Sequence, residues 1–313
     1  MSTSPASGAS ADSTNTAMLA TARLGILGGS GLYAMEGLEA IEEIAIDTPY
    51  GPPSDSLRLG RIGAMEVVFL ARHGRHHTHM PTVVPYRANL WAMRSLGVRW
   101  ILSVSAVGSL QEGLQPLDFV VPDQFIDRTH QRPLTLFGDG LVAHVTAADP
   151  FCPVLSDLLV EAARPLMPDG RSLHQGGTYL CMEGPAFSTR AESQLYRSWG
   201  ADVIGMTNHT EARLAREAEI AYATLAMVTD YDCWHEGHES VTVEMVIANL
   251  HANAALAQRV VRAAAERIGQ ERPASKAHSA LRYALMTPKE QVSDESRRKF
   301  DLFTAPYWGP FAG

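Results

Sequence analysis

The feature that most restricts the fold is an alternation of short apolar runs with helical patterns from Leu24 to Ile268. The apolar runs end in Gly, Ser or a charged residue, as strands do; they read LGILGG, MEVVFLA, RWILSVSAVG, DFVVPD, GTYLCME, ADVIGM and AYATLAMV. Strands that alternate with helices indicate an α/β architecture around a largely buried sheet. Since no Pro/Gly-rich linker interrupts this range, we expect one domain rather than two.

Local patterns predict the helices between these strands. YRANLWAMRSLG ends on Gly97, a plausible stop. Thr189 and Glu192 have capping-box spacing ahead of AESQLYRSWG, and Asn208 stands as an N-cap with Glu211 three residues on. The segment VTVEMVIANLHANAALAQRVVRAAAERI keeps a helical period for many turns.

The two ends of the chain differ from this central part. Residues 1–22 are rich in Ser, Thr and Ala without a core-forming pattern or a secretory signal, which predicts a disordered tail. Residues 23–270 form the predicted domain. Residues 271–313 change to a charged helix and an aromatic end, APYWGPFAG, which we expect to dock on its own or a neighbouring subunit.

Composition excludes several classes of protein. The net charge of −8 argues against nucleic-acid binding, which needs a basic face. No run approaches the roughly 18 apolar residues of a membrane span. The three cysteines Cys152, Cys181 and Cys233 are odd in number and lack zinc spacing, which indicates reduced thiols in a cytoplasmic protein.

A glycine-rich loop follows the first predicted strand, in GILGGSGLY. It supplies Gly28, Gly29 and Gly31 around Ser30, and glycines let backbone N–H groups converge on an anion without steric clash. The GGxG spacing differs from the GxGxxG of dinucleotide-binding loops, and the lysine of a P-loop is absent. The loop alone is equally compatible with an anion site and with a tight turn that binds nothing.

The strand MEVVFLA runs into a basic, histidine-rich segment, LARHGRHHTHM. Arg72 and His73 stand at the strand end, where a guanidinium fork and an imidazole suit phosphate. The later histidines, His76, His77 and His79, have no carboxylate or second cluster at metal-ligand spacing. We therefore expect Arg72 and His73 to bind an anion and the other three to form a polar loop.

Two further strand ends carry small or polar groups. SVSAVGSL brings Ser105, Ala106 and Gly108 to the end of its strand. Met206 and Thr207 stand between the strand ADVIGM and the next helix, whose N-terminus presents free N–H groups and the positive end of the helix dipole. Thr207 is therefore either an anion ligand or a helix cap, and Met206 either the floor of a site or a core residue.

Two carboxylates, Asp230 and Asp232, end the last buried strand, in LAMVTDYDCWHEGHE. A carboxyl whose pKa is raised by burial suits general acid–base catalysis, the role expected for Asp230, whereas Asp232 can equally be a turn residue. The five strand ends together predict one anion pocket beside an apolar cleft with a carboxyl. Because a single arginine serves it, the anion should be small and bound mostly by neutral groups, which favours a phosphorolytic or phosphate-binding enzyme over a kinase.

Longer motifs resemble the purine nucleoside phosphorylase family, in particular its members that cleave 5′-methylthioadenosine. They extend from about Leu24 to Ile268 and read GILGGSGLY, DTPYGPPSD, LARHGRHHTHMP, YRANLWA, FIDRTHQRP, ADPFCP, MEGPAFSTRAES and ADVIGMTNHTEARLAREAEIAYATLAMVTDYDCWH. The resemblance implies a mixed central β-sheet flanked by helices and a homotrimer. It also implies no metal or organic cofactor, with inorganic phosphate as the co-substrate.

The resemblance also assigns roles to individual residues. Phosphate would be bound by Ser30, Arg72, His73, Ser105, Ala106 and Thr207. The nucleoside would contact Met206 at the ribose, Asp230 and Asp232 at the purine edge, Phe187 stacked on the base, Val243, Val246 and Ile247 around the 5′-alkylthio group, and His144 from the adjacent subunit. Asp230 would be the catalytic acid.

The implied reaction converts 5′-methylthioadenosine and phosphate to adenine and 5-methylthioribose 1-phosphate, a step of purine and methionine salvage. Asp230 would protonate the purine at N7 while phosphate attacks C1′. The alternative is a purine nucleoside phosphorylase or 5′-methylthioinosine phosphorylase with a 6-oxopurine preference. Two other classes are a nicotinamide-dependent oxidoreductase, which depends on GILGGSG alone, and a non-catalytic nucleotide-binding module. Neither explains the strand-end donors around a single arginine.

The chain departs from the family pattern at a few positions. Gly205 stands where some members carry Asn, and Val107 replaces a Cys. His209 and Thr210 occupy the stretch where a proline usually precedes Glu211. Loss of this proline can loosen the helix start and change how Glu211 is presented, which bears on substrate stringency more than on the type of reaction.

Overall fold

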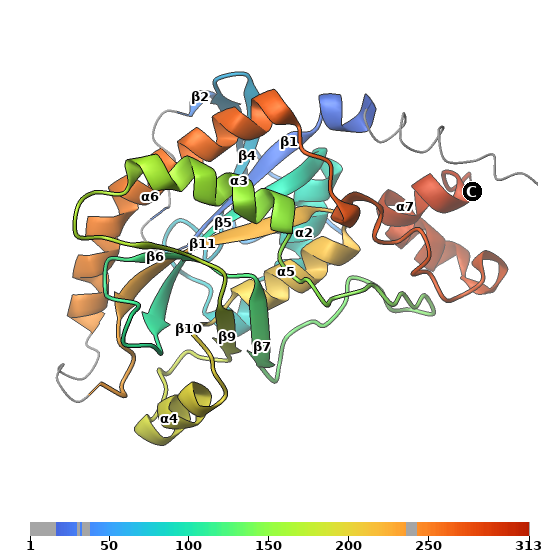
Figure 1. Cartoon of the computed structure of the whole chain (residues 1–313). Helices are drawn as coiled ribbons and strands as arrows, with labels where there is room; N and C mark the ends of the chain where they lie inside the picture. The colour runs from blue at the N-terminus through green and yellow to red at the C-terminus, as the bar shows by residue number, and fades with distance from the viewer. Residues whose placement is uncertain (1–16, 30–31, 33–37, 236–242, 313) are drawn as a thin grey trace, which may run out of the picture.

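The computed structural model describes residues 17–29, 32, 38–235 and 243–312, except the side chains of residues 40, 243, 245 and 246. Its strands form one mixed sheet (Figure 1). They are β1 Arg23–Gly28, β2 Glu39–Ile44, β3 Leu57–Ile62, β4 Met65–Ala71, β5 Val98–Ser109, β6 Phe119–Val121, β7 Gln124–Arg128, β8 Leu173–Gln175, β9 Thr178–Met182, β10 Val203–Gly205 and β11 Ala221–Asp230.

The sheet divides around the long strand β5. The main path runs β2-β3-β4-β1-β5-β10-β9-β7, and β11 also pairs with β5 and leads to β6 and β8. Strands β1 and β11 lie parallel to β5, whereas the short β10 pairs antiparallel with the end of β5. Gly108 on β5 is opposite both Ile204 on β10 and Asp230 on β11. The ends of three strands therefore meet at one point of the sheet.

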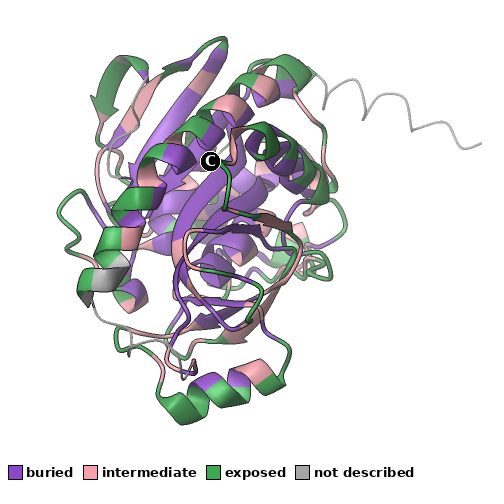
Figure 2. Cartoon of the chain, turned by 60° about the vertical axis from the view of Figure 1, so that its left-hand side comes forward, coloured by how far each residue is buried: buried purple, intermediate pink, exposed green. Residues whose placement is uncertain are grey.

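Helices cover both faces of the sheet. They are α2 Tyr86–Ser95, α3 Pro153–Ala163, α4 Arg190–Ser198, α5 Asn208–Glu217, α6 Val243–Glu271 and α7 Asp294–Trp308, with short 3-10 helices at Pro81–Val83, Arg164–Leu166, Lys276–Ser279 and Lys289–Gln291. In β1, Leu24 and Ile26 pack with α3 and α6, and Leu27 packs with α2 and α5. This alternation follows from the two-residue period of a strand. Figure 2 shows the buried strands between helices whose outer surfaces are exposed.

Two of the predicted helix ends are confirmed and one is wrong. Gly97 follows α2 with a φ of +78°, and the Thr189 side chain forms the predicted capping box at the start of α4. Helix α5, however, begins at Asn208 itself, with Thr207 as its N-cap and no capping hydrogen bond from that side chain. The Asn208 amide is instead turned inward, where it donates to the Tyr222 hydroxyl at 2.9 Å. Interior polar contacts outweigh the local capping pattern here.

The folded part of the chain begins before the boundary indicated by composition. Residues 1–16 lie outside the described part of the chain. Leu19 and Ala22, which belong to the predicted tail, are buried in the same core as α3 and α6. Apolar side chains in a Ser- and Ala-rich stretch thus contribute to the core even without a visible period.

The C-terminal extension packs on its own chain. Phe300 and Phe303 of α7 are buried against Phe137, with ring centroids 5.6 and 6.0 Å apart. The Tyr307 hydroxyl donates to the Glu219 carboxylate that precedes β11. Figure 1 shows α7 at one side of the molecule, away from α4. Among the described residues, no helix combines the length and apolarity that crossing a bilayer requires.

Candidate active site

A cavity of about 500 Å³ lies where the ends of β4, β5, β10 and β11 come together. Nine of the predicted site residues line it: Arg72, His73, Ser105, Ala106, Phe187, Met206, Thr207, Asp230 and Asp232. Other wall residues were not assigned to the site from the sequence, among them His77, Met80, Met182, Pro185, Ile204, Thr229 and Leu250. The predicted convergence of strand ends therefore corresponds to one cavity in the structure.

The remaining predicted residues are not placed on this wall. Ser30 lies outside the described residues, as do the side chains of Val243 and Val246. Ile247 is 45% exposed, and Leu250, one helical turn further along α6, lines the cavity. His144 is exposed beside a second cavity of about 390 Å³, so its predicted contact with a ligand would have to be made across subunits.

Arg72, at the end of β4, is fully buried and already paired. Its Nε and Nη2 donate to both carboxylate oxygens of Glu211, its Nη2 also to Ser103 Oγ at 2.6 Å, and its Nη1 to the Val104 carbonyl at 3.1 Å. Burial acts to lower the pKa of Arg72, but the Glu211 carboxylate more than offsets it and the pKa is raised. Of the five guanidinium hydrogens, these contacts leave one on Nη1.

This pairing limits what Arg72 can donate to an anion. The guanidinium fork that the sequence assigned to phosphate is used by Glu211. Arg72 can therefore donate one hydrogen bond to an anion. The Glu211 carboxylate largely cancels its positive charge, so the electrostatic attraction between Arg72 and the anion is weak. Sequence reasoning placed Glu211 in a capping box and missed the pairing.

His73 is held as a neutral imidazole. Its Nδ1 lies 2.7 Å from the His79 carbonyl, which only accepts, so Nδ1 carries the hydrogen. Burial, reinforced by the neighbouring Arg72 charge, lowers the pKa of His73 to about 3. In the neutral tautomer Nε2 is then an acceptor. His77, predicted to belong to a polar loop, stacks on His73 with ring centroids 4.5 Å apart and also lines the cavity.

Ser105, Ala106 and Thr207 form the other side of this anion-binding edge. Ser105 and Thr207 are buried, and both line the cavity. Ser105 Oγ makes only a long contact, 3.3 Å, to the Ala106 carbonyl. Thr207 is the N-cap of α5, so the free N–H groups and the positive dipole end of that helix lie beside the cavity. Neutral donors thus predominate at this edge.

Asp230, the last residue of β11, has no cation among its contacts within the described chain. Its carboxylate accepts from the Thr229 hydroxyl at 2.7 Å and from the Asp232 amide at 2.8 Å. Burial raises the pKa of Asp230 to about 6, although both hydrogen bonds act in the opposite direction. Gly108 makes room for it, because a Cβ there would lie 2.9 Å from Asp230 Oδ1.

The second carboxylate, Asp232, lies on the same wall. It has a left-handed backbone with φ of +49°, as expected of a residue that turns the chain sharply away from a strand. Burial also raises the pKa of Asp232. Its amide, rather than its side chain, contacts Asp230.

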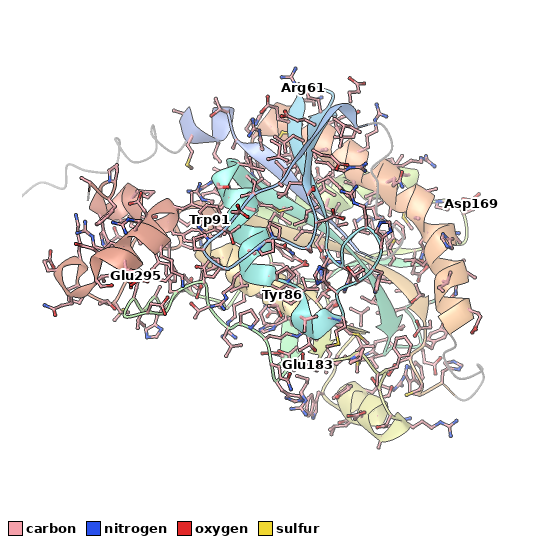
Figure 3. All side chains as sticks on the ribbon, turned by 180° about the vertical axis from the view of Figure 1, so that it is seen from behind. Arg61, Tyr86, Trp91, Asp169, Glu183 and Glu295 are labelled. Carbon is pink, nitrogen blue, oxygen red and sulfur yellow. The ribbon has the colours of Figure 1, made fainter. Side chains whose placement is uncertain are left out.

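A buried arginine outside the predicted set connects the loops around the cavity. Arg132 donates to the Glu183 carboxylate at 2.6 Å, the Tyr86 hydroxyl at 2.8 Å and the Met206 carbonyl at 2.9 Å. Burial acts to raise the pKa of Glu183, but the His130 amide and Arg132 lower it to about 2. Figure 3 labels Tyr86 at the start of α2 and Glu183 on the loop after β9. The motifs FIDRTHQRP and MEGPAF contained this pairing, but their spacing gave no sign of it.

No group of three or more His, Cys, Asp or Glu side chains in the described part of the chain is arranged to hold a metal ion. The three cysteines are unpaired. What the cavity offers is an edge of neutral donors, a buried carboxyl with a raised pKa and apolar walls, an arrangement suited to an anion and a polar heterocycle.

A family model described as the phosphorylase superfamily matches residues 23–266, and the chain belongs to this family. S-methyl-5′-thioadenosine phosphorylase of Prochlorococcus marinus is 69% identical over 294 residues, 94% of either chain. The enzyme of the same name from Thermosynechococcus vestitus is 58% identical over 92% of this chain and 99% of its own.

Solved structures agree with these relatives. A methylthioadenosine phosphorylase from an Antarctic soil metagenomic library has a TM-score of 0.86 and 53% identity, covering 90% of this chain and 98% of its own. A methylthioadenosine phosphorylase from Schistosoma mansoni in complex with adenine has a TM-score of 0.77 and 38% identity, covering 80% and 93%. The predicted family and the predicted single α/β fold with a mixed sheet are confirmed.

Proposed function

We propose that this chain catalyses phosphorolysis of 5′-methylthioadenosine, giving adenine and 5-methylthioribose 1-phosphate. One observation carries the proposal: a single cavity holds an edge of anion donors and the Asp230 carboxyl, whose pKa is raised by burial. The relatives named as S-methyl-5′-thioadenosine phosphorylases, identical at 50–69% over nearly the whole chain, support this substrate.

Asp230 would supply the proton that makes adenine a leaving group. With a pKa near 6, a useful fraction of this carboxyl keeps its proton close to neutral pH. As the C1′–N9 bond breaks, its electron pair passes to the purine and the Asp230 proton passes to N7. A phosphate oxygen forms the new bond to C1′, and the proton lost by hydrogen phosphate restores the acid form of the carboxyl.

The anion-binding edge would hold phosphate, and the negative charge of the bound phosphate would stabilise the positive charge that develops on the ribose. Ser105 and Thr207 would donate to phosphate oxygens together with free N–H groups at the start of α5. Neutral His73, with Nδ1 fixed on the His79 carbonyl, would accept a hydrogen bond at Nε2 from the hydroxyl group of hydrogen phosphate. Arg72 would contribute its remaining Nη1 hydrogen, and Ser30 would add a donor from the glycine-rich loop.

The purine side would be defined by Asp230, Asp232 and Phe187, with Met206 against the ribose. A carboxyl can both donate to N7 and accept from a 6-amino group, which supports adenine as the base. The names of the relatives do not favour the alternative with a 6-oxopurine preference. Val243, Val246 and Ile247 are the residues proposed to surround the methylthio group.

Assembly and location also remain proposals. We infer a homotrimer in which His144 reaches the 5′ end of a ligand in the adjacent subunit; the exposure of His144 supports such a contact. Reduced cysteines and a substrate from purine and methionine salvage support a cytoplasmic location.

Adenine release from 5′-methylthioadenosine, measured with and without inorganic phosphate, tests the proposed function. We expect release only when phosphate is present, and much slower cleavage of inosine under the same conditions. Equal release without phosphate would identify a hydrolase and contradict phosphorolysis.

A further inference from the structure

Tyr179, on β9, has an unusual environment for a tyrosine. The residue is fully buried, and its hydroxyl has no hydrogen-bond partner among the described residues. Buried hydroxyl groups nearly always find a partner, because one left unsatisfied loses its hydration without compensation. A hydroxyl of this kind indicates either a strained packing or a contact that forms only when a ligand is bound.

The position of this hydroxyl explains Gly205. Tyr179 is opposite Val203 in the parallel pairing of β9 with β10, and its ring extends toward the end of β10. A Cβ built on Gly205 would lie 1.9 Å from Tyr179 Oη and 2.6 Å from Cζ. Space, rather than a left-handed backbone, therefore requires glycine at this departure from the family pattern.

Tyr179 Oη also lies behind the anion-binding edge. Burial raises the pKa of Tyr179 well above its ordinary value, while the Ser105 hydroxyl and the Thr207 amide are near enough to act against that shift. Neither contact meets the geometry of a hydrogen bond in the structure. Ser105 and Thr207 both face the cavity. The tyrosine keeps its proton and is therefore a donor beside two groups expected to contact phosphate.

Ser105 is free to respond to such a donor. Its only hydrogen bond described here is the 3.3 Å contact to the Ala106 carbonyl, which is at the long end of the range. A hydroxyl has one hydrogen and two lone pairs. If Tyr179 donates to one lone pair, the Ser105 hydrogen can turn away from Ala106 and toward the cavity.

We propose that Tyr179 is a positioning residue for the anion: its hydroxyl donates to Ser105 Oγ when phosphate binds, and so directs the Ser105 hydrogen to a phosphate oxygen. Gly205 is the matching residue that leaves room for this hydroxyl. The proposal rests on the proposed function, since it takes phosphate as the anion. It predicts a defect specific to phosphate, whereas a tyrosine that only fills the core would affect stability alone.

Titration of inorganic phosphate into the full chain, without nucleoside, tests this directly. Tyr179→Phe keeps the ring and deletes the hydroxyl, and we expect its dissociation constant for phosphate to rise roughly fivefold to tenfold, as for loss of one hydrogen bond in a network around a charge. The KM for 5′-methylthioadenosine at saturating phosphate should change less than about twofold. Tyr196→Phe removes the hydroxyl of another largely buried tyrosine, on α4 and outside the residues that line the cavity, and should leave phosphate affinity unchanged.

A second pair of variants separates the hydroxyl from the packing. Gly205→Ala should displace Tyr179, lowering both the melting temperature and phosphate affinity. Adding Tyr179→Leu to Gly205→Ala removes the clash, so the melting temperature should recover while phosphate affinity stays low. Full recovery of phosphate affinity in the double variant would show that the hydroxyl is not needed, and would overturn the proposal.

The outcomes distinguish this proposal from the proposed function. Equal phosphate affinity in the wild type and Tyr179→Phe would overturn the role of Tyr179 and leave phosphorolysis untouched. A wild-type protein that binds no phosphate would contradict both.

Discussion

Two buried ionisable residues that line the same cavity, Arg72 and Asp230, have opposite kinds of surroundings. Arg72 is 1% exposed and is matched by Glu211, with further acceptors around its guanidinium group. Asp230 is 6% exposed and is matched by no cation, only by two neutral donors. The first therefore keeps its charge at any ordinary pH, whereas the second is driven toward its protonated form.

This difference shows that the effect of burial on an ionisable group depends on whether the group has an oppositely charged partner. A buried charge with a partner keeps its charge and its position. Because desolvation offsets most of the attraction within such a pair, the pair fixes the positions of its side chains more than it adds net stability. A buried carboxyl without a partner shifts its pKa and becomes a proton carrier near neutral pH. The proposed reaction needs both, since phosphate requires a rigid neutral edge and the purine requires a proton.

Removing the proton carrier should have the largest effect. In Asp230→Asn the amide cannot supply an acidic proton to N7, so kcat for adenine release from 5′-methylthioadenosine should fall about 10²- to 10⁴-fold. The relative preference should shift toward 6-oxo nucleosides, because an amide can donate to a 6-oxygen.

The matched variant is Asp232→Asn, on the same wall of the cavity. It should lower kcat by less than about tenfold, because the Asp230 acid stays in place and keeps its hydrogen bond from the backbone amide of residue 232. Wild-type turnover by Asp230→Asn would show that the assigned acid is wrong.

Breaking the fixed pair should mainly reduce stability. Glu211→Gln leaves the Arg72 charge buried without its counter-charge, which should lower the free energy of unfolding by about 3–5 kcal/mol. Chemical denaturation followed by circular dichroism measures this difference.

Glu266→Gln provides the control, because Glu266 pairs with Arg262 four residues away on the exposed side of α6. That change should cost less than about 0.5 kcal/mol. If both variants lose equally little free energy of unfolding, the Arg72–Glu211 pair does not stabilise the fold more than a surface pair does. The contrast with Asp230 would then be wrong.

The pH dependence of stability should give the smallest of the three effects. The folded-state pKa of Asp230 is about 6 against an ordinary 3.8, so the folded state binds the proton more tightly. Its stabilising contribution is complete below about pH 4 and is lost as pH rises through 6. Relative to Asp230→Asn, the wild type should lose at most roughly 3 kcal/mol between pH 4 and 7. A constant difference across this range would contradict the raised pKa.

The sequence predicted what depends on local order along the chain. Parallel strands carry their ends to one edge of the sheet, so Ser105 and Asp230 could be grouped before any coordinates were known. The capping box at Thr189 and the glycine after α2 are likewise local. Strand β2, reading EAIEEI, was missed because its acidic residues hide the apolar alternation of an edge strand.

Partners distant in sequence could not be predicted in this way. Arg72 and Glu211 are 139 residues apart, and the local capping pattern around Asn208 indicated a different role for Glu211. The Tyr179–Gly205 match depends on the register of β9 with β10, which no single-strand pattern specifies. In each instance tertiary packing determines which of several locally acceptable contacts a side chain makes.

Product analysis tests the central claim most directly. Phosphorus-31 NMR of 5′-methylthioadenosine and phosphate incubated with the protein should show one sugar 1-phosphate formed, and one inorganic phosphate consumed, for each adenine released. Adenine accompanied by free methylthioribose, with inorganic phosphate unchanged, would contradict the account.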